Sequence, residues 1–131
     1  MNLEDKAGNE FEWDEESEEK RSRDEIFKAP LYEFYIAGVQ HHKLKTCINE
    51  VEVGDILTMV AEPTNKYDPN AIRLEFQSLE QGASIMVGYV PGKISASVSA
   101  TMVVSDLFCE VIELTRDEKP WKQIKVAIKE V

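Results

Sequence analysis

The sequence has little cysteine, little histidine and no long apolar run, and each shortage excludes a class of protein. Two cysteines, Cys47 and Cys109, are too few and too far apart for a disulfide framework. Both lie among apolar residues, which predicts buried free thiols. No apolar stretch approaches the length that spans a bilayer, and no signal-peptide pattern opens the chain. We therefore expect an intracellular, cytoplasmic protein with no membrane partner.

Arrangements of residues that support catalysis or hold cofactors are also missing. His41 and His42 are adjacent, with no Cys or His at ligand spacing, so they are interpreted as exposed turn residues and no metal site is predicted. The run Gly88-Tyr-Val-Pro-Gly-Lys93 fails as a phosphate-binding loop because its glycines are one residue too close. In addition, Ile94 stands where Ser or Thr must hold magnesium. We predict a binding module that is not an enzyme and uses no cofactor.

Positive charge is scarce, since 15 Lys and Arg stand against 25 Asp and Glu, for a net charge of −10. Residues 1–29 hold eleven of the acids, five of the bases and few apolar side chains, which predicts an acidic tail that is disordered or partly helical. A minor alternative is that Phe11 and Trp13 within this tail bind a basic partner or mimic nucleic acid. Residues 30–131 are predicted to form one domain, with a net charge of −4.

Alternation of apolar and polar residues predicts a mostly β domain. Strands are expected at 34–39, 55–61, 70–76, 85–90, 107–114 and 121–131, and a helix at 93–104; residues 44–53 fit either a short helix or a strand pair. Gly88 within a strand indicates a bulge or a close backbone approach. One apolar face and a basic edge predict that the last strand is an outer one. The expected fold is a small five- to six-stranded antiparallel barrel, OB-like or SH3-like, with one or two short helices.

The stretch from Glu62 to Leu74, Glu-Pro-Thr-Asn-Lys-Tyr-Asp-Pro-Asn-Ala-Ile-Arg-Leu, is the most informative part of the chain. Two prolines fix φ, and Asn65, Asp68 and Asn70 can bond nearby backbone, which predicts two successive turns between strands. A stiff loop that carries an aromatic ring, a carboxylate and an amide is suited to recognition. The alternative is a connection whose polar groups satisfy only their own backbone, and local chemistry alone favours that alternative.

The pattern Glu62-Pro-x-Asn-x-Tyr-Asp-x-Asn-Ala-Ile72 resembles the signature of the HIRAN domain family. The aromatic strand 34–39, Val53-Gly-Asp55 and Val87-Gly-Tyr-Val-Pro91 flank it in the family's order, and the chain is similar to stand-alone, prokaryotic-type members. The resemblance implies a modified β-barrel that captures the unpaired 3′ end of single-stranded DNA, in DNA repair or processing. In such a site the terminal bases lie between aromatic rings and a carboxylate binds the free 3′-hydroxyl.

The resemblance also implies a set of DNA-binding residues: Phe34, Tyr35, Asn65, Tyr67, Asp68, Tyr89 and Lys93. In this set Asp68 matches the carboxylate that reads the 3′-hydroxyl, and Asn65 and Tyr67 match ligand-contacting or loop-shaping positions. Phe34 and Tyr35 lie on the strand that supplies the stacking surface.

Tyr89 and Lys93 of this set are candidates for contact with the phosphates. Each assignment has a structural alternative. Phe34 and Tyr67 fit the core, Asp68 fits a turn cap through Asn70, and Tyr89 fits packing against Trp121.

The implied partners are single-stranded DNA or DNA ends, together with a helicase, nuclease or other protein. The rival hypothesis is a protein-interaction or regulatory domain that binds no DNA. Nucleic-acid binders usually carry a basic surface, so the placement of the basic residues separates the two hypotheses. Convergence of Lys66, Arg73 and Lys93 on one groove with Tyr35 and Asp68 favours DNA, whereas scatter favours a protein partner.

Overall fold

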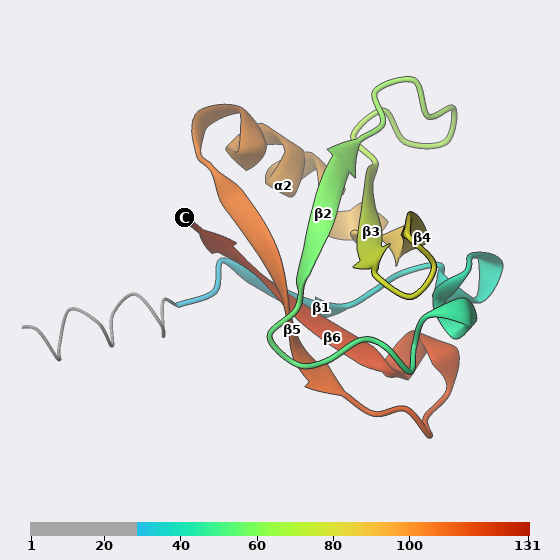
Figure 1. Cartoon of the computed structure of the whole chain (residues 1–131). Coiled ribbons are helices and arrows are strands. Elements are labelled where there is room, and N and C mark those ends of the chain that lie inside the picture. The colour runs from blue at the N-terminus through green and yellow to red at the C-terminus, as the bar shows by residue number, and fades with distance from the viewer. Residues whose placement is uncertain (1–28) are drawn as a thin grey trace, which may run out of the picture.

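The computed structural model describes residues 29–131, and the predicted acidic tail lies almost wholly outside them (Figure 1). The element order is β1 (Tyr32–Tyr35), η1 (Val39–His41), η2 (Leu44–Thr46), β2 (Ile56–Ala61), β3 (Ile72–Ser78), β4 (Ala83–Tyr89), α2 (Gly92–Val104), β5 (Leu107–Leu114), η3 (Pro120–Lys122) and β6 (Ile124–Glu130). The predicted mostly β class is confirmed. Six strands form one antiparallel sheet in the order β1-β6-β5-β2-β3-β4, with one α-helix among the described residues.

The sheet is curled, but no continuous hydrogen-bond ladder closes it into a barrel. Its two edge strands are β1 and β4. They meet at one pair beyond the end of β1, where Ala37 N donates to Tyr89 O and Tyr89 N donates to Ala37 O, each at 2.9 Å. Figure 1 shows the curvature, since β2 and β3 run at a steep angle to β1 and β6. The end of β4 therefore lies beside the chain that follows β1.

Gly88 permits this meeting of the edges. The predicted bulge is present, because the β3–β4 register shifts between Leu74, which faces Gly88, and Glu75, which faces Met86. The predicted close approach is also present. A Cβ on Gly88 would lie 2.5 Å from the carbonyl oxygen of Ala37 and 2.5 Å from Ile36 Cγ2. Any side chain here would push the two edges apart.

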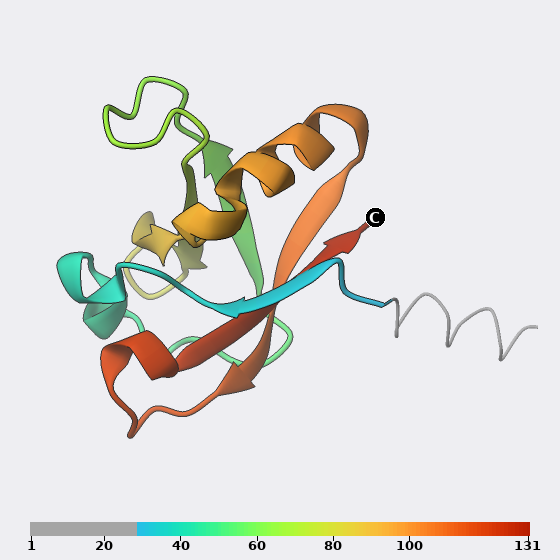
Figure 2. The same cartoon turned by 180° about the vertical axis from the view of Figure 1, so that it is seen from behind.

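The core forms on the inner side of the curl. In β3 the alternation buries Ile72, Leu74 and Phe76 and leaves the intervening residues more exposed. Helix α2 connects β4 to β5 and lies across the sheet in Figure 2. Its Val98 is buried among the strands, and the two other residues of its predicted apolar face, Ile94 and Met102, pack against the same core.

Several element predictions require correction. Strand β6 is not an outer strand, because it pairs with β1 on one side and β5 on the other. Its lysines pair with carboxylates of those neighbours, and Lys129 Nζ lies 2.8 Å from Glu110 Oε1. A strand with a basic face can therefore lie inside the sheet and need not be an edge strand. Strand β1 ends before 39, since Gly38 takes a φ of +70° and turns the chain into η1. Residues 44–53 form η2 followed by turns, not a strand pair.

Both cysteines are free and buried, as predicted. Burial raises the pKa of Cys47 to about 11, with the Glu50 charge adding to the effect, and raises that of Cys109 to about 12. Both thiols are therefore protonated at neutral pH and act as apolar side chains. Within residues 29–131, no helix is both long enough and apolar enough to cross a membrane.

Candidate nucleic-acid interface

A groove of about 510 Å³ opens where the loop between β2 and β3 approaches the turn after β1 and the start of α2. It is lined by Ala37, Gly38, His41, His42, Asn65, Tyr67, Asp68, Ala71, Tyr89, Val90 and Gly92. Its volume is typical of sites that hold a small ligand. The groove brings together four of the residues predicted for DNA binding, which are Asn65, Tyr67, Asp68 and Tyr89.

Side chains of the loop fix its own backbone as two successive turns. Asn65 Oδ1 accepts hydrogen bonds from the backbone N–H groups of Tyr67 at 2.9 Å and Asp68 at 3.1 Å. Asp68 Oδ1 accepts one from the N–H of Asn70 at 2.9 Å. The expected turn chemistry is therefore present, and Asp68 is the turn cap that the structural alternative described. The same bonds leave the Tyr67 side chain pointing into solvent, where it is 86% exposed.

Asp68 is also held from the helix side. The hydroxyl of Ser95, a residue of α2 that is only 1% exposed, donates to Asp68 Oδ2 at 2.7 Å. Each carboxylate oxygen can accept more than one hydrogen bond, so both oxygens can accept a further bond. Capping and ligand binding are therefore compatible roles for this carboxylate.

Glu62 joins the loop to β3 and β4. Its Oε1 accepts hydrogen bonds from the Tyr89 hydroxyl at 2.9 Å and from Asn65 Nδ2 at 3.0 Å, and its Oε2 accepts one from Arg73 Nη1 at 3.0 Å. Burial acts to raise the pKa of Glu62, but the bonds from these three donors outweigh it and hold the pKa below its usual value. Burial, followed by the bond to Glu62, raises the pKa of Tyr89, so its phenol stays protonated as a donor.

The HIRAN domain model matches residues 31–130 of the chain. This chain belongs to the HIRAN domain family. The HIRAN domain of human HLTF is similar in structure, with a TM-score of 0.54 at 12% identity, covering 76% of this chain and 73% of that chain. A protein from Lactobacillus plantarum has a TM-score of 0.61 at 19% identity, covering 78% and 93%. No curated protein matches the sequence. These TM-scores show a shared fold, and HIRAN domains are binding modules generally associated with DNA binding.

The other predicted residues of this HIRAN domain lie outside the groove. The predicted stacking role of Phe34 requires correction, because its side chain is only 8% exposed within the core cluster and cannot stack on a base. The alternation of β1 turns Tyr35 outward instead, and the Lys125 ammonium lies 5.9 Å from its ring centroid. Lys93 is exposed and follows Gly92, which lines the groove. The ring of Tyr89 meets the ring of His42 edge-on, with centroids 5.5 Å apart. Within residues 29–131 Tyr89 makes no ring contact with Trp121, so the alternative that these two side chains pack together is not supported.

The basic residues do not converge on the groove of this HIRAN domain. Arg73 bonds to Glu62 and to Glu75, so its charge is already matched. Neither Lys66 nor Lys93 lines the groove, although the Lys66 ammonium lies 5.3 Å from the ring centroid of Tyr67, a lining residue, and Lys93 follows Gly92, another lining residue. Among the described lining residues, the histidines are the only side chains that can carry positive charge. Burial lowers the pKa of His42, the neighbouring His41 lowers it further, and Glu62 acts in the opposite direction. The described lining of the groove therefore contains no lysine or arginine.

Sequence reasoning missed two residues that build this site, Glu62 as a hub and Ser95 as the helix-side donor. Glu62 bonds to Tyr89, and Ser95 bonds to Asp68, each across 27 positions of the chain. Glu62 opens the family signature and was a visible signal. Ser95 sits in a helix with several serines and gave none.

Proposed function

We propose that this domain is a non-catalytic DNA-binding module that captures the unpaired 3′ end of a single strand, in DNA repair or processing. The observation that carries the proposal is the Asp68 carboxylate, held by Asn70 and Ser95 inside a groove beside the exposed ring of Tyr67. Membership of the HIRAN domain family supports DNA as the ligand.

A fixed carboxylate can distinguish a free 3′ end from a blocked one. A 3′-hydroxyl donates a hydrogen bond to an ionised acceptor, and such charge-assisted bonds are among the stronger ones in proteins. A 3′-phosphate would instead place negative charge against Asp68, which is the repulsive element that specificity requires. The absence of lysine and arginine from the described lining of the groove is consistent with recognition of an end group.

Aromatic rings beside the carboxylate would hold the terminal bases. The ring of Tyr67 is exposed, with the Lys66 ammonium 5.3 Å from its centroid. Each base stacked on an aromatic contributes about 1–3 kcal/mol with little dependence on sequence. Tyr89 forms part of the wall, and its hydroxyl is fixed by Glu62. We assign Asn65 the role of shaping the loop, since its side chain accepts from the backbone N–H groups of Tyr67 and Asp68 and donates to the Glu62 carboxylate.

Fluorescence anisotropy at low salt tests the proposal. The probes are single-stranded oligonucleotides that end in a 3′-hydroxyl or a 3′-phosphate, titrated with the wild type and with Asp68→Ala. We expect about tenfold tighter binding of the hydroxyl probe by the wild type, equivalent to about 1.4 kcal/mol, and no preference in the variant. Asp106→Ala is the matched control, because it removes the same charge from an exposed position between α2 and β5 that does not line the groove.

A rival function, a protein-interaction or regulatory domain without DNA binding, is favoured by the scatter of Lys66, Arg73 and Lys93. The same titration separates the two. Failure of both probes to bind at high micromolar protein would reject the DNA function. Equal affinity of the wild type for the two probes would reject end recognition while leaving general DNA binding.

A further inference from the structure

A second surface outside the groove combines aromatic rings with lysines. Trp121 of η3 is 47% exposed and Tyr35 of β1 is 41% exposed. The Lys119 ammonium lies 5.8 Å from the centroid of the Trp121 ring, and that of Lys125 lies 5.9 Å from the centroid of the Tyr35 ring. Both distances are within the range of cation–π attraction. With Lys122, the last residue of η3, these residues form what we call the η3 surface: Tyr35, Lys119, Trp121, Lys122 and Lys125.

The η3 surface adjoins the groove through β1. Tyr35 pairs with Lys125 across the β1–β6 ladder, so the exposed side chains of β1 lie beside those of β6. Ala37, which lines the groove, is two residues further along the chain, where an extended backbone points side chains to the same side as Tyr35.

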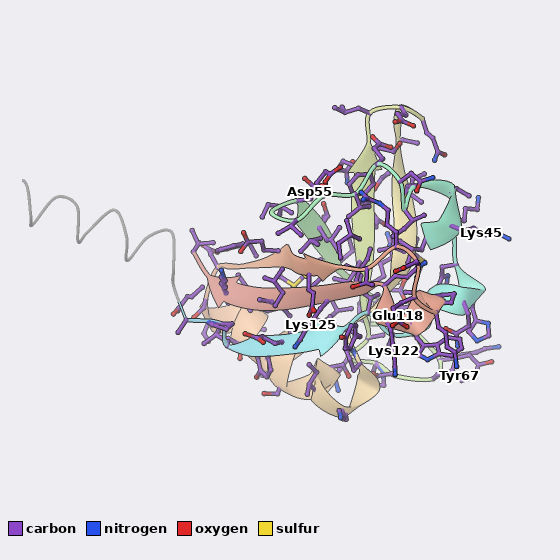
Figure 3. The ribbon with its side chains drawn as sticks, turned by 90° about the horizontal axis from the view of Figure 1, so that it is seen from below. Lys45, Asp55, Tyr67, Glu118, Lys122 and Lys125 are labelled. Atoms are coloured by element: carbon purple, nitrogen blue, oxygen red, sulfur yellow. The ribbon has the colours of Figure 1, made fainter. Side chains whose placement is uncertain are left out.

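A second link runs through the short helices, because η1 is in contact with η3. His42 lines both the main groove and a smaller one of about 240 Å³ whose other wall includes Pro120 of η3. In Figure 3, Lys122 and Lys125 lie on the same side of the molecule as β1, α2 and Tyr67. A ligand that fills the groove can therefore continue onto the η3 surface.

The charge of the η3 surface differs from that of the whole chain. Residues 116–125 contain four bases and two acids, whereas the whole chain has a net charge of −10. The Lys125 ammonium lies 3.9 Å from Glu33, so its charge is partly matched. Within residues 29–131, Lys119 and Lys122 take part in no salt bridge. Their ammonium groups are available to an anionic ligand.

We propose that the η3 surface binds the nucleotides that precede the captured 3′ end, so that single-stranded DNA runs from the groove along β1 onto η3. Exposed rings interleaved with lysines are what single-strand binding uses, since the rings stack on bases and the lysines attract phosphates. The inference rests on the proposed function, and it supplies the phosphate contacts that the groove itself lacks.

Length dependence tests the η3 surface. The full chain is titrated at several salt concentrations with labelled thymidine oligomers of three and twelve nucleotides, each with a free 3′-hydroxyl. The wild type binds the longer oligomer at least tenfold more tightly. Trp121→Ala weakens binding of the longer oligomer about fivefold or more, as expected for one lost base stack, and leaves the shorter one unchanged.

A matched pair of lysine substitutions tests the phosphate contacts. Lys122→Gln lowers the slope of log affinity against log salt for the longer oligomer by about 0.7, the value for one lost phosphate contact on a single strand. Lys43→Gln removes the same charge from an exposed residue beside β4 and leaves this slope unchanged. Thermal unfolding of each variant verifies that the fold is intact.

The outcomes separate this inference from the proposed function. Equal affinity of the wild type for both oligomers, with binding that depends on Asp68, overturns the η3 surface alone. Tight binding of the longer oligomer that is lost in Trp121→Ala, but is equal for 3′-hydroxyl and 3′-phosphate ends, supports the η3 surface and rejects end capture. No binding of either oligomer overturns both.

Discussion

The two tyrosines of the groove have different surroundings, and substitution can separate their roles. The Tyr89 hydroxyl donates to Glu62 Oε1 at 2.9 Å, whereas the Tyr67 side chain is almost fully exposed. We expect Tyr89→Phe to lower the free energy of unfolding by about 1 kcal/mol, because a partly buried acceptor loses its donor. Tyr67→Phe, the same chemical change, leaves stability unaltered. Urea unfolding of both variants is the measurement, and equal stabilities would contradict the assigned role of the Tyr89 bond.

At this scale the sequence predicted the residues that a local signature carries. Asn65, Tyr67 and Asp68 stand within four positions, so their joint presentation follows from turn chemistry that can be read directly. Phe34 and Tyr35 show the limit of such reading, since a strand has two faces and only the fold decides which one is buried. Ser95 was unpredictable because its partner Asp68 is 27 positions away on another element.

The contact between the loop and α2 depends on the Ser95 hydroxyl. Ser95→Ala removes the donor to Asp68 Oδ2 from a buried position. We expect stability to fall by about 1–2 kcal/mol and the preference for a 3′-hydroxyl over a 3′-phosphate to weaken, because the carboxylate loses one of its two supports. Ser99→Ala is the control, because it makes the same change at a half-buried position of the same helix that does not line the groove. Loss of stability with an unchanged end preference would limit Ser95 to a structural role.

Among the elements, the junction of the edge strands depends on Gly88. Gly88→Ala places a methyl group 2.5 Å from the Ala37 carbonyl oxygen, so β1 and β4 must separate. We expect a loss of about 2–3 kcal/mol, in the range for overpacked sites, and a lower thermal midpoint. Gly92→Ala is the contrast, since a Cβ there meets nothing within 4 Å. Two variants of similar stability would show that the junction adapts to the added methyl.

The elements themselves were largely predictable, whereas their order in the sheet was not. Strands β2 to β5 and helix α2 follow clear periodicities, and each lies within a few residues of its predicted range. The central place of β6 depends on pairing with β1, whose sequence lies about ninety positions earlier. A half-polar strand is compatible with an edge or an interior position, because Glu33 and Glu110 on neighbouring strands can match its lysines.

For the whole molecule, acid should weaken folding in two stages that belong to different groups. Burial and then the charge of His41 lower the pKa of His42 from 6.5, so the unfolded chain takes up this proton before the native one does. Stability therefore declines as the pH falls below about 6.5 toward the native value of His42. His42→Gln should remove this first stage.

The second stage belongs to the carboxylate network around Arg73. The pKa of Glu62 lies below 4.5 because its three donors outweigh burial, and that of Glu75 is lowered by hydrogen bonds, first from Ser84 and then from Arg73. A native pKa below the unfolded one stabilises the fold fully above about pH 4.5 and loses that contribution as the pH falls through the native value.

Urea midpoints measured from pH 8 to pH 3 test both stages. Glu62→Gln should lower stability at pH 7, because Arg73 and Tyr89 lose their charged acceptor, and should flatten the profile below about pH 4.5. Glu113→Gln, on an exposed position of β5, is the control for the loss of one carboxylate from a chain with 25 acids. A Glu62→Gln profile parallel to the wild type down to pH 3 would show that this network does not cause the acid sensitivity. The loss would then belong to the general titration of the acidic surface.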